Sequence, residues 1–241
     1  MKKFTKKIIK SILRFLGWKL IKITKHTSPR THKVDMKMLN CLNNASGIMH
    51  LGAHRGTEAE AYHWFGKKVI WFEAIPDIFQ DLKERLHLYP TQKAFCTMLG
   101  DADNVKKNFY VSNCDGGLSS IFDFSKETLN KIYWPGNKYK VAKKLNLKMS
   151  KLDTILKENN VSAEDYDHWI VDLQGGELVA LKGAEESLKS CKSIYTEISK
   201  LKFYEGGVLW NEISAWLKER NFYPTEEPTN DHTNVLFVKK K

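Results

Sequence analysis

An acidic residue followed by two glycines stands at the end of an apolar run in the second half of the sequence. The run 168–173 is typical of a buried strand; Asp172 lies near its end, Gly175 and Gly176 turn the chain, and Glu177 begins a helical pattern. Ligands bind at the carboxyl ends of the strands of an open α/β sheet. A carboxylate there can accept a proton from a substrate, or it can accept backbone N–H groups of its own turn. We therefore take Asp172 as the first candidate for a general base, and the structural alternative stays open.

A second turn with small residues follows the apolar run 47–51. Gly52, Ala53 and Gly56 lead directly into a helical pattern. Small residues let the backbone approach a ligand closely, and N–H groups at a helix N-terminus point toward it. This turn is therefore predicted to contact a cofactor. His54 in the same turn is the second candidate for a catalytic base, although a histidine in such a loop is more often only a partly exposed residue.

Two further acids follow strand-like runs. Glu73 comes directly after the run 68–72 and stands 21 residues beyond Gly52. An acid at about this distance accepts hydrogen bonds from the ribose hydroxyls of a nucleoside cofactor, so the two positions together predict nucleoside binding. The alternative for Glu73 is a solvated residue before the next helix. Asp101 follows the run 93–99 and either reaches an adenine amino group or belongs to a surface turn.

Short apolar runs alternate with amphipathic stretches over most of the chain. Strands are predicted at 47–51, 68–72, 93–99, 108–112, 168–173, 193–198, 222–225 and 234–239, and helices at 57–65, 78–87, 177–188 and 209–220. Such alternation predicts an α/β fold with a doubly wound, parallel sheet. The strand at 108–112 is expected to pair with that at 93–99. The polar and aromatic stretch 123–147 is either an inserted cap over the strand ends or a solvated excursion.

The order of several sequence blocks resembles the FkbM-type family of S-adenosylmethionine-dependent methyltransferases. The resemblance extends over about residues 48–222 and rests on HLGAHRGTE, WFEAIPDIF, MLGDADN, GLSSIF, SKLDTIL, VDLQGGELVALKGA and TEIS followed by FYEGG. It implies a class I methyltransferase fold, which is Rossmann-like with a mostly parallel seven-stranded sheet. It also implies that the methyl group of S-adenosylmethionine is transferred, usually to a hydroxyl oxygen of a sugar or natural product.

The resemblance also implies roles for the residues at matching positions. Gly52, Ala53 and Gly56 would line the methionine part of the cofactor, and Glu73 would bind its ribose. Asp172 and Gln174 would face the sulfonium and the acceptor. Ser119 and Ser120 match a serine pair near the cofactor, and Glu177 and Glu197 would lie along the same rim of strand ends. His50 stands where the family usually has an acid that helps to hold the cofactor's amino group, and an imidazole cannot fully replace that charge. Asp172 and Glu197 could together offer oxygen ligands to a divalent metal, but two carboxylates are too few to predict a metal site.

The net charge of +11 lies in one N-terminal segment. Residues 1–33 contain nine Lys, two Arg and no Asp or Glu, and the 28 basic and 28 acidic residues of 34–241 balance. A nucleic-acid-binding surface over the whole body is therefore not supported, although a local basic patch stays open. No apolar run in 1–26 exceeds two residues, so a membrane-spanning helix and a signal peptide are not expected.

The same segment predicts a basic amphipathic helix and a linker that ends at residue 33, before a methyltransferase domain over 34–241. Its apolar residues recur with a helical period. Such a helix lies on an anionic membrane surface, or it packs its apolar face on the body or on a partner. The four cysteines show no zinc-binding spacing and are typical of a reduced, cytoplasmic protein.

Three functions are compatible with these patterns. The first is methylation of a hydroxyl in a glycan or lipid-linked sugar at the inner face of the membrane. The second is methylation of a soluble small molecule or natural product. The third is a non-catalytic binding module that retains the fold, which the histidine at position 50 leaves open. The acceptor and the oligomeric state do not follow from the sequence.

Overall fold

The computed structural model describes residues 36–130 and 138–240. The predicted amphipathic helix and linker at 1–33 lie outside the described residues. None of the described helices combines the length and the apolar character that a bilayer crossing requires.

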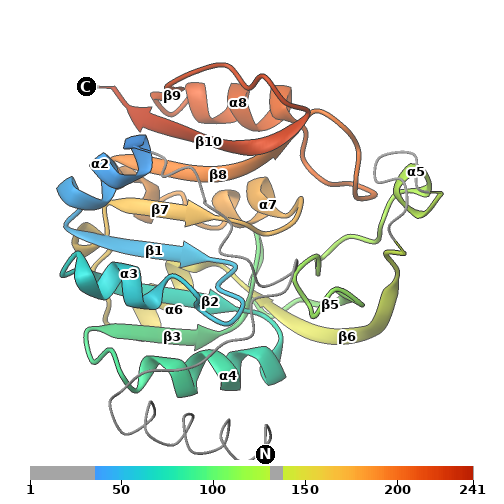
Figure 1. The fold of residues 1–241 in the computed structure, drawn as a ribbon, viewed down its shortest axis with the longest axis horizontal. Helices are drawn as coiled ribbons and strands as arrows, with labels where there is room; N and C mark the ends of the chain where they lie inside the picture. The colour runs from blue at the N-terminus through green and yellow to red at the C-terminus, as the bar shows by residue number, and fades with distance from the viewer. Residues whose placement is uncertain (1–35, 131–137, 241) are drawn as a thin grey trace, which may run out of the picture. The chain divides into compact units, whose positions relative to one another are not determined.

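Seven strands form the central sheet in the order β3-β2-β1-β7-β8-β10-β9 (Figure 1). They are β1 (Gly47–Leu51), β2 (Lys68–Glu73), β3 (Gln92–Cys96), β7 (His168–Val171), β8 (Ser193–Ser199), β9 (Phe222–Pro224) and β10 (His232–Lys239). Strand β10 is antiparallel to both of its neighbours, and the remaining pairs are parallel. The predicted doubly wound, mostly parallel, seven-stranded sheet is therefore confirmed.

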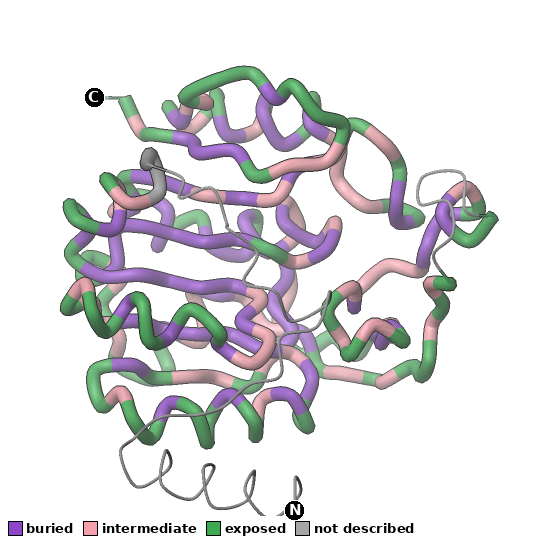
Figure 2. Tube along the Cα trace, viewed as in Figure 1, coloured by how far each residue is buried: buried purple, intermediate pink, exposed green. Residues whose placement is uncertain are grey.

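Helices cover both faces of this sheet because each central strand has apolar side chains on both of its sides. One face packs on α2 (Met36–Asn44), α3 (Ala59–Trp64) and α4 (Pro76–Leu86), and the other on α6 (Leu152–Glu158), α7 (Glu177–Lys182) and α8 (Trp210–Lys218). The short 3-10 helices are η1 (Ala163–Asp165) and η2 (Ser187–Lys189). Every residue of β1 and β7 is buried (Figure 2).

Helix α7 is shorter than the predicted helix at 177–188. It ends at Lys182 and is capped by Gly183, where an added Cβ would lie only 1.9 Å from the carbonyl oxygen of Gly100. The chain therefore passes Gly100 at a distance that admits no side chain, and this close approach brings the turn after β4 against the end of α7.

A separate sheet in the order β4-β6-β5 corrects two predictions. The predicted strand at 93–99 divides between β3 in the large sheet and β4 (Met98–Leu99) in the small one. Strand β5 (Lys106–Ser112) pairs antiparallel with β6 (Val141–Ser150), not with 93–99 as predicted. Strand β6 begins inside the stretch 123–147 that was expected to be a cap or an excursion and continues beyond it. It was missed because its lysines hide the alternation of Leu145, Leu147 and Met149. The short helix α5 (Lys126–Leu129) lies before it.

The order of the strands reverses between β1 and β7, which are adjacent in the sheet although far apart in the chain. The crevice at such a switch point is where open α/β sheets bind ligands. The turns that follow β1 and β7 must therefore hold the functional residues.

Candidate active site

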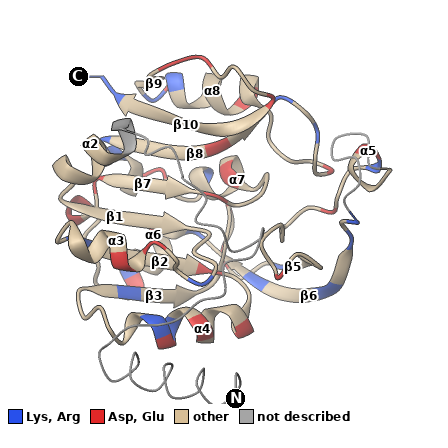
Figure 3. Ribbon diagram, viewed as in Figure 1, with Lys and Arg blue, Asp and Glu red and all other residues tan. Residues whose placement is uncertain are grey.

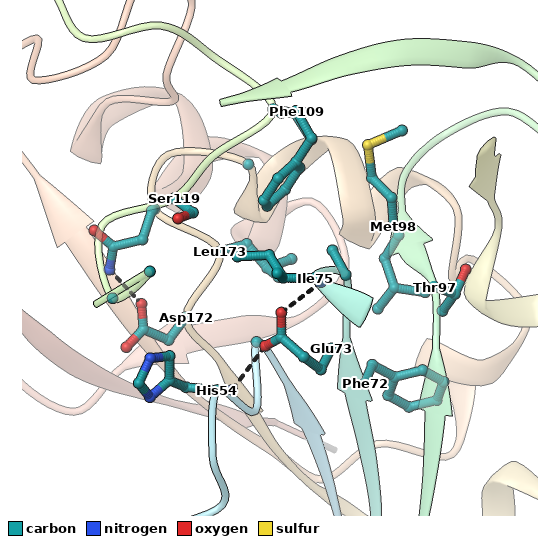
Figure 4. Close-up of a pocket in the computed structure, with 18 residues that line it drawn as sticks. His54, Phe72, Glu73, Ile75, Thr97, Met98, Phe109, Ser119, Asp172 and Leu173 are labelled. Atoms are coloured by element: carbon teal, nitrogen blue, oxygen red, sulfur yellow. Dashed lines mark hydrogen bonds between the residues drawn. The ribbon is translucent and has the colours of Figure 1, made fainter. Parts of the chain in front are cut away.

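A cavity opens at the carboxyl ends of β1, β2 and β7 (Figure 4). It encloses about 690 Å³, part of it open to solvent. Its lining comes from those strand ends, from β4 and β5 and from the turn after β5: Gly52, His54, Phe72, Glu73, Ala74, Ile75, Thr97, Met98, Leu99, Phe109, Gly116, Gly117, Ser119, Ile121, Asp172, Leu173, Gln174 and Gly176. Apolar walls with a few polar groups are the usual composition of a small-molecule site.

The turns after β1 and β7 touch at the floor of this cavity. The Asp172 N–H donates to the carbonyl of Leu51 over 2.9 Å. Gly52 has a φ of +90°, and a Cβ on it would lie 1.8 Å from the carbonyl oxygen of Asp172. A side chain at Gly52 is excluded on both counts, so the backbone itself forms the floor.

The Glu73 carboxylate lies in the cavity wall at the end of β2. It accepts the backbone N–H of His54 at 2.8 Å and that of Ile75 at 2.7 Å, as the dashed lines in Figure 4 show. Burial raises the pKa of Glu73, although these two hydrogen bonds oppose the rise. Each carboxylate oxygen has a second lone pair. The residue therefore fits a diol such as the two hydroxyls of a ribose.

Arg55 holds the turn after β5 over the cavity. Its guanidinium donates from Nη1 to Asp115 Oδ2 at 2.7 Å and from Nη2 to Oδ1 at 3.1 Å, and its Nε donates to Asp81 of α4 at 2.8 Å. His54 Nε2 lies 2.8 Å from the Asp115 carbonyl oxygen. The next residue, Gly116, lines the cavity.

Replacing Arg55 by Met is expected to weaken cofactor binding by about threefold, because an exposed ion pair contributes little. The dissociation constant of S-adenosylmethionine, measured by calorimetry, provides the test. Lys83→Met on α4 is the matched control. An unchanged constant in Arg55→Met would show that the turn holds its position without this pair.

The side chain of Gln174 joins three groups beside Asp172. Its Nε2 donates to Asp172 Oδ1 at 2.6 Å and to Glu197 Oε2 at 2.9 Å, and its Oε1 accepts the Tyr204 hydroxyl at 2.7 Å. The backbone carbonyl of Gln174 accepts a hydrogen bond from the Ser120 hydroxyl at 2.7 Å. Gln174 has a φ of 53°, which is uncommon for a residue with a side chain. The hydrogen bonds of its side-chain amide and of its backbone carbonyl hold this conformation.

Three carboxyl groups crowd together at this point. Asp172, Glu177 and Glu197 offer oxygens that all lie within 4.8 Å of one another, and Figure 3 shows the acidic colour on α7 and β8 side by side. Burial, and then the charge of Glu197, raise the pKa of Glu177 to about 8. Loss of hydration within the surrounding protein, and then the charge of Glu197, raise the pKa of Asp172 to about 7, although its hydrogen bond with Gln174 opposes the rise. Near neutral pH this group therefore retains protons.

A divalent cation is a second way to neutralise such a group. Each of the three carboxylates already accepts hydrogen bonds: Asp172 and Glu197 from Gln174, and Glu177 from the N–H groups of Leu173 and Gly175. We describe the three as a hydrogen-bonded cluster and assign no metal to it.

The structure brings six of the predicted residues together and separates the others. The cavity is lined by Gly52, His54, Glu73, Ser119, Asp172 and Gln174. Outside its lining, Ala53 and Gly56 shape the turn after β1, and Ser120 supports Gln174 from behind. Asp101 is exposed in a bend and does not line the cavity. Its position favours the surface turn over the adenine contact.

His50 lies outside the cavity, which corrects its expected place among the cofactor-binding residues. Side chains alternate along a strand, so His50 points to the helical face that holds α3. Its ring stacks on Trp71 with centroids 4.6 Å apart, and its Nδ1 lies 3.3 Å from the Tyr62 hydroxyl. Burial lowers the pKa of His50 to about 4, against the opposing charge of Glu58. The ring is a neutral part of the core.

His50→Gln is therefore expected to change the acid stability of the protein and not its cofactor affinity. The folded pKa of His50 is below that of the unfolded chain, so unfolding takes up a proton between about pH 6.5 and pH 4 and stability falls as the pH falls. Between pH 7 and pH 5 the variant should lose about 2 kcal/mol less than the wild type. Urea unfolding at both pH values tests this, with exposed His63→Gln as the control. Equal losses in wild type and variant would contradict a buried neutral His50.

Several lining residues are absent from the predicted site. Thr97, Met98 and Leu99 line the cavity because the chain leaves the large sheet after β3 and crosses to the small one. The adjacent Gly116 and Gly117 carried a signal, since a glycine pair after a strand marks a turn. No sequence signal marked Phe109, because its place in the cavity depends on the pairing of β5 with β6.

Together the doubly wound sheet and this cavity form the class I methyltransferase fold that the sequence predicts. Solved structures to which the chain is similar include magnesium protoporphyrin IX methyltransferase of Synechocystis PCC 6803 with bound S-adenosylmethionine (8% identity, 98% of this chain and 97% of that one, TM-score 0.47). Others are a TehB-like S-adenosylmethionine-dependent methyltransferase of Corynebacterium glutamicum (8%, 99% and 97%, TM-score 0.43) and precorrin-6y C5,15-methyltransferase of Geobacter metallireducens (11%, 91% and 93%, TM-score 0.45).

The family model of the methyltransferase FkbM domain matches residues 50–224. The chain therefore belongs to the FkbM family of S-adenosylmethionine-dependent methyltransferases, as the sequence blocks predict. A search of the curated proteins found no match.

Proposed function

We propose that this chain binds S-adenosylmethionine in the cavity after β1, β2 and β7 and methylates a hydroxyl oxygen of a sugar in a glycan or lipid-linked saccharide. The observation that carries the proposal is the Asp172 carboxyl group, which lines the cavity at the switch point and has a pKa raised to about 7. A carboxylate with this pKa is a competent base near neutral pH.

The residues present fit the cofactor. Glu73 offers two acceptor oxygens to the ribose hydroxyls, and the side-chain-free backbone at Gly52 leaves room for the amino acid part. The walls beside Glu73 are apolar at Ile75, Met98 and Phe109, which suits the face of an adenine ring. S-adenosylmethionine held there would supply an electrophilic methyl group for transfer to the acceptor oxygen.

Asp172 takes the proton that the acceptor hydroxyl must lose. Its Oδ1 accepts a hydrogen bond from Gln174 Nε2 at 2.6 Å, which restrains the carboxylate in the lining of the cavity. The contribution of this chain is thus the alignment of the two reactants and the removal of one proton. His54, the second candidate base, is hydrogen-bonded to the Asp115 carbonyl and is better suited to holding the turn after β5.

Calorimetry with S-adenosylmethionine tests the first part of the proposal. We expect saturable binding to the wild-type chain, with S-adenosylhomocysteine as a competitor. Absence of binding at millimolar concentrations would contradict the proposed enzyme function and would favour a non-catalytic module that retains the fold. A screen of saccharides and small hydroxylated natural products, read out as S-adenosylhomocysteine formed, then separates a sugar acceptor from a soluble small molecule.

We also propose that residues 1–33 bring the enzyme to the cytoplasmic face of an anionic membrane. The support is their eleven basic residues without an acid and their amphipathic spacing. Flotation of the chain, with and without 1–33, on vesicles with and without phosphatidylserine tests this. The full chain should float only with the anionic vesicles. Failure to float would favour packing of this segment on the body or on a partner and a soluble acceptor.

A further inference from the structure

His232, at the start of β10, lies next to the carboxyl cluster but outside the cavity that holds Asp172. Its Nε2 is 3.0 Å from Glu197 Oε1. Glu197 and His232 line a second, smaller cavity together with Glu177 and Tyr204. Gln174, which lines the first cavity, is hydrogen-bonded to two of these residues, Glu197 and Tyr204. Its amide therefore stands between the two cavities.

The sheet register explains this meeting. Asn234 is paired with Glu197 across the antiparallel strands β10 and β8, and His232 lies two residues before Asn234. His232 and Glu197 are thus diagonal neighbours on one face of the sheet, a separation that long side chains can bridge. The His232 ring also forms a T-shaped contact with the ring of Phe203, with centroids 4.8 Å apart.

A continuous set of hydrogen bonds leads from His232 to Asp172. It runs from the imidazole to Glu197, from Glu197 to the Gln174 amide, and from that amide to Asp172 Oδ1 over 2.6 Å. We propose that His232 is a positioning residue for methyl transfer, which neutralises Glu197 and thereby keeps Asp172 ionised to accept the acceptor's proton. This role rests on the proposed function of Asp172 as the base.

The charges around His232 make the proposal specific. The charges of Glu197 on β8 and Asp172 after β7 act on His232. Glu177 on α7 and the phenol of Tyr204 line the same small cavity as His232, and the charge of Glu58 after β1 raises the pKa of Asp172. Burial lowers the pKa of His232, but its hydrogen bond with Glu197 and the charges of Glu197 and Asp172 outweigh burial and raise it. The positively charged imidazolium is therefore more favourable here than for a histidine in water, and it is this form that Glu197 and Asp172 stabilise.

Neighbouring charges of opposite sign must shift the ionisation of Asp172 in opposite directions. Removal of the imidazolium in His232→Gln leaves Glu197 uncompensated and makes ionised Asp172 less favourable. Removal of the carboxylate in Glu197→Gln has the reverse effect, while the new amide oxygen can still accept the hydrogen bond of Gln174. A purely structural role for either residue gives no such opposition of sign.

Carboxyl and imidazole NMR titrations of the full chain in buffer with EDTA test the inference without an acceptor. Relative to wild type, the Asp172 midpoint should rise in His232→Gln and fall in Glu197→Gln, each by about 1 pH unit. It should not move in His63→Gln, the control at an exposed position of α3. An unchanged midpoint in His232→Gln, or shifts of the same sign in both variants, would overturn the proposal.

A second measurement covers the case in which His232→Gln does not fold. Coupling between two titrating groups is reciprocal, so Asp172→Asn should lower the His232 midpoint by the same amount, and an unmoved His232 would overturn the proposal. Calorimetry with S-adenosylmethionine on the same samples keeps the two hypotheses apart. Lost cofactor binding with intact opposing shifts contradicts the proposed function, whereas intact binding without the shifts contradicts only the role of His232.

Discussion

Asp172→Asn is expected to reduce kcat by about 10²- to 10⁴-fold, the usual contribution of a positioned base. Asparagine keeps an oxygen for the hydrogen bond of Gln174, so the turn after β7 should retain its shape, but it cannot take a proton. The dissociation constant of S-adenosylmethionine should change by less than about threefold, because proton transfer to Asp172 occurs only in the chemical step and does not contribute to cofactor binding. Turnover is measured as S-adenosylhomocysteine formed with the acceptor found by screening.

The dependence of the rate on pH provides a second test of Asp172 as the base. A base must be ionised to act, and the pKa of Asp172 is raised to about 7. The rate of the wild type should therefore rise with pH through about 7, and this acid limb should disappear in Asp172→Asn. Asp101→Asn, at an exposed acid outside the cavity, is the charge-matched control. Near-wild-type turnover in Asp172→Asn would leave Asp172 with the structural role, that of a carboxylate in its own turn.

Glu73→Ala is expected to weaken binding of S-adenosylmethionine by about 10²- to 10⁴-fold. Two hydrogen bonds from ribose hydroxyls to a buried carboxylate are lost, and hydrogen bonds to charged groups contribute about 1.5–3 kcal/mol each. Calorimetry provides the measurement. Because the Ala variant also leaves the N–H groups of His54 and Ile75 without their acceptor, the loss combines ligand contacts with distortion of the turn.

A ligand without ribose hydroxyls separates these two causes. The wild type should bind adenosine more tightly than 2′,3′-dideoxyadenosine, and in Glu73→Ala the two should bind equally. A preference for adenosine that persists in the variant would mean that another residue holds the ribose, and that Glu73 supports only the turn after β1.

The parts of the fold that follow from local pattern could be predicted. Six of the seven strands of the large sheet are recognisable as apolar or β-branched runs within a few residues of their observed bounds, and the third is overextended into β4. Strand β6 could not be recognised as readily, because lysines occupy the exposed side of its alternation. The pairing of β5 with β6 joins segments separated by a long intervening stretch, and such pairings depend on which strands meet in the folded chain.

The candidate site divides in the same way. Gly52, Glu73 and Asp172 stand next to strand ends, and strand ends in a parallel sheet meet at one edge, so their type and place in the sequence were enough to predict that they come together. His50 was misplaced because its role was carried over from the family pattern. The alternation of side chains in β1 directs it instead into the core under α3.

The sequence alone thus determined the class of fold, the protein family and the position of three residues at strand ends, because each is encoded by a few neighbouring positions. The tertiary structure decided that Gln174 links Asp172 to Glu197, that Arg55 holds the turn at Asp115, and that His232 stands beside the carboxyl cluster. These contacts join residues from different elements across the sheet. They depend on strand order and antiparallel register, which no local spacing contains.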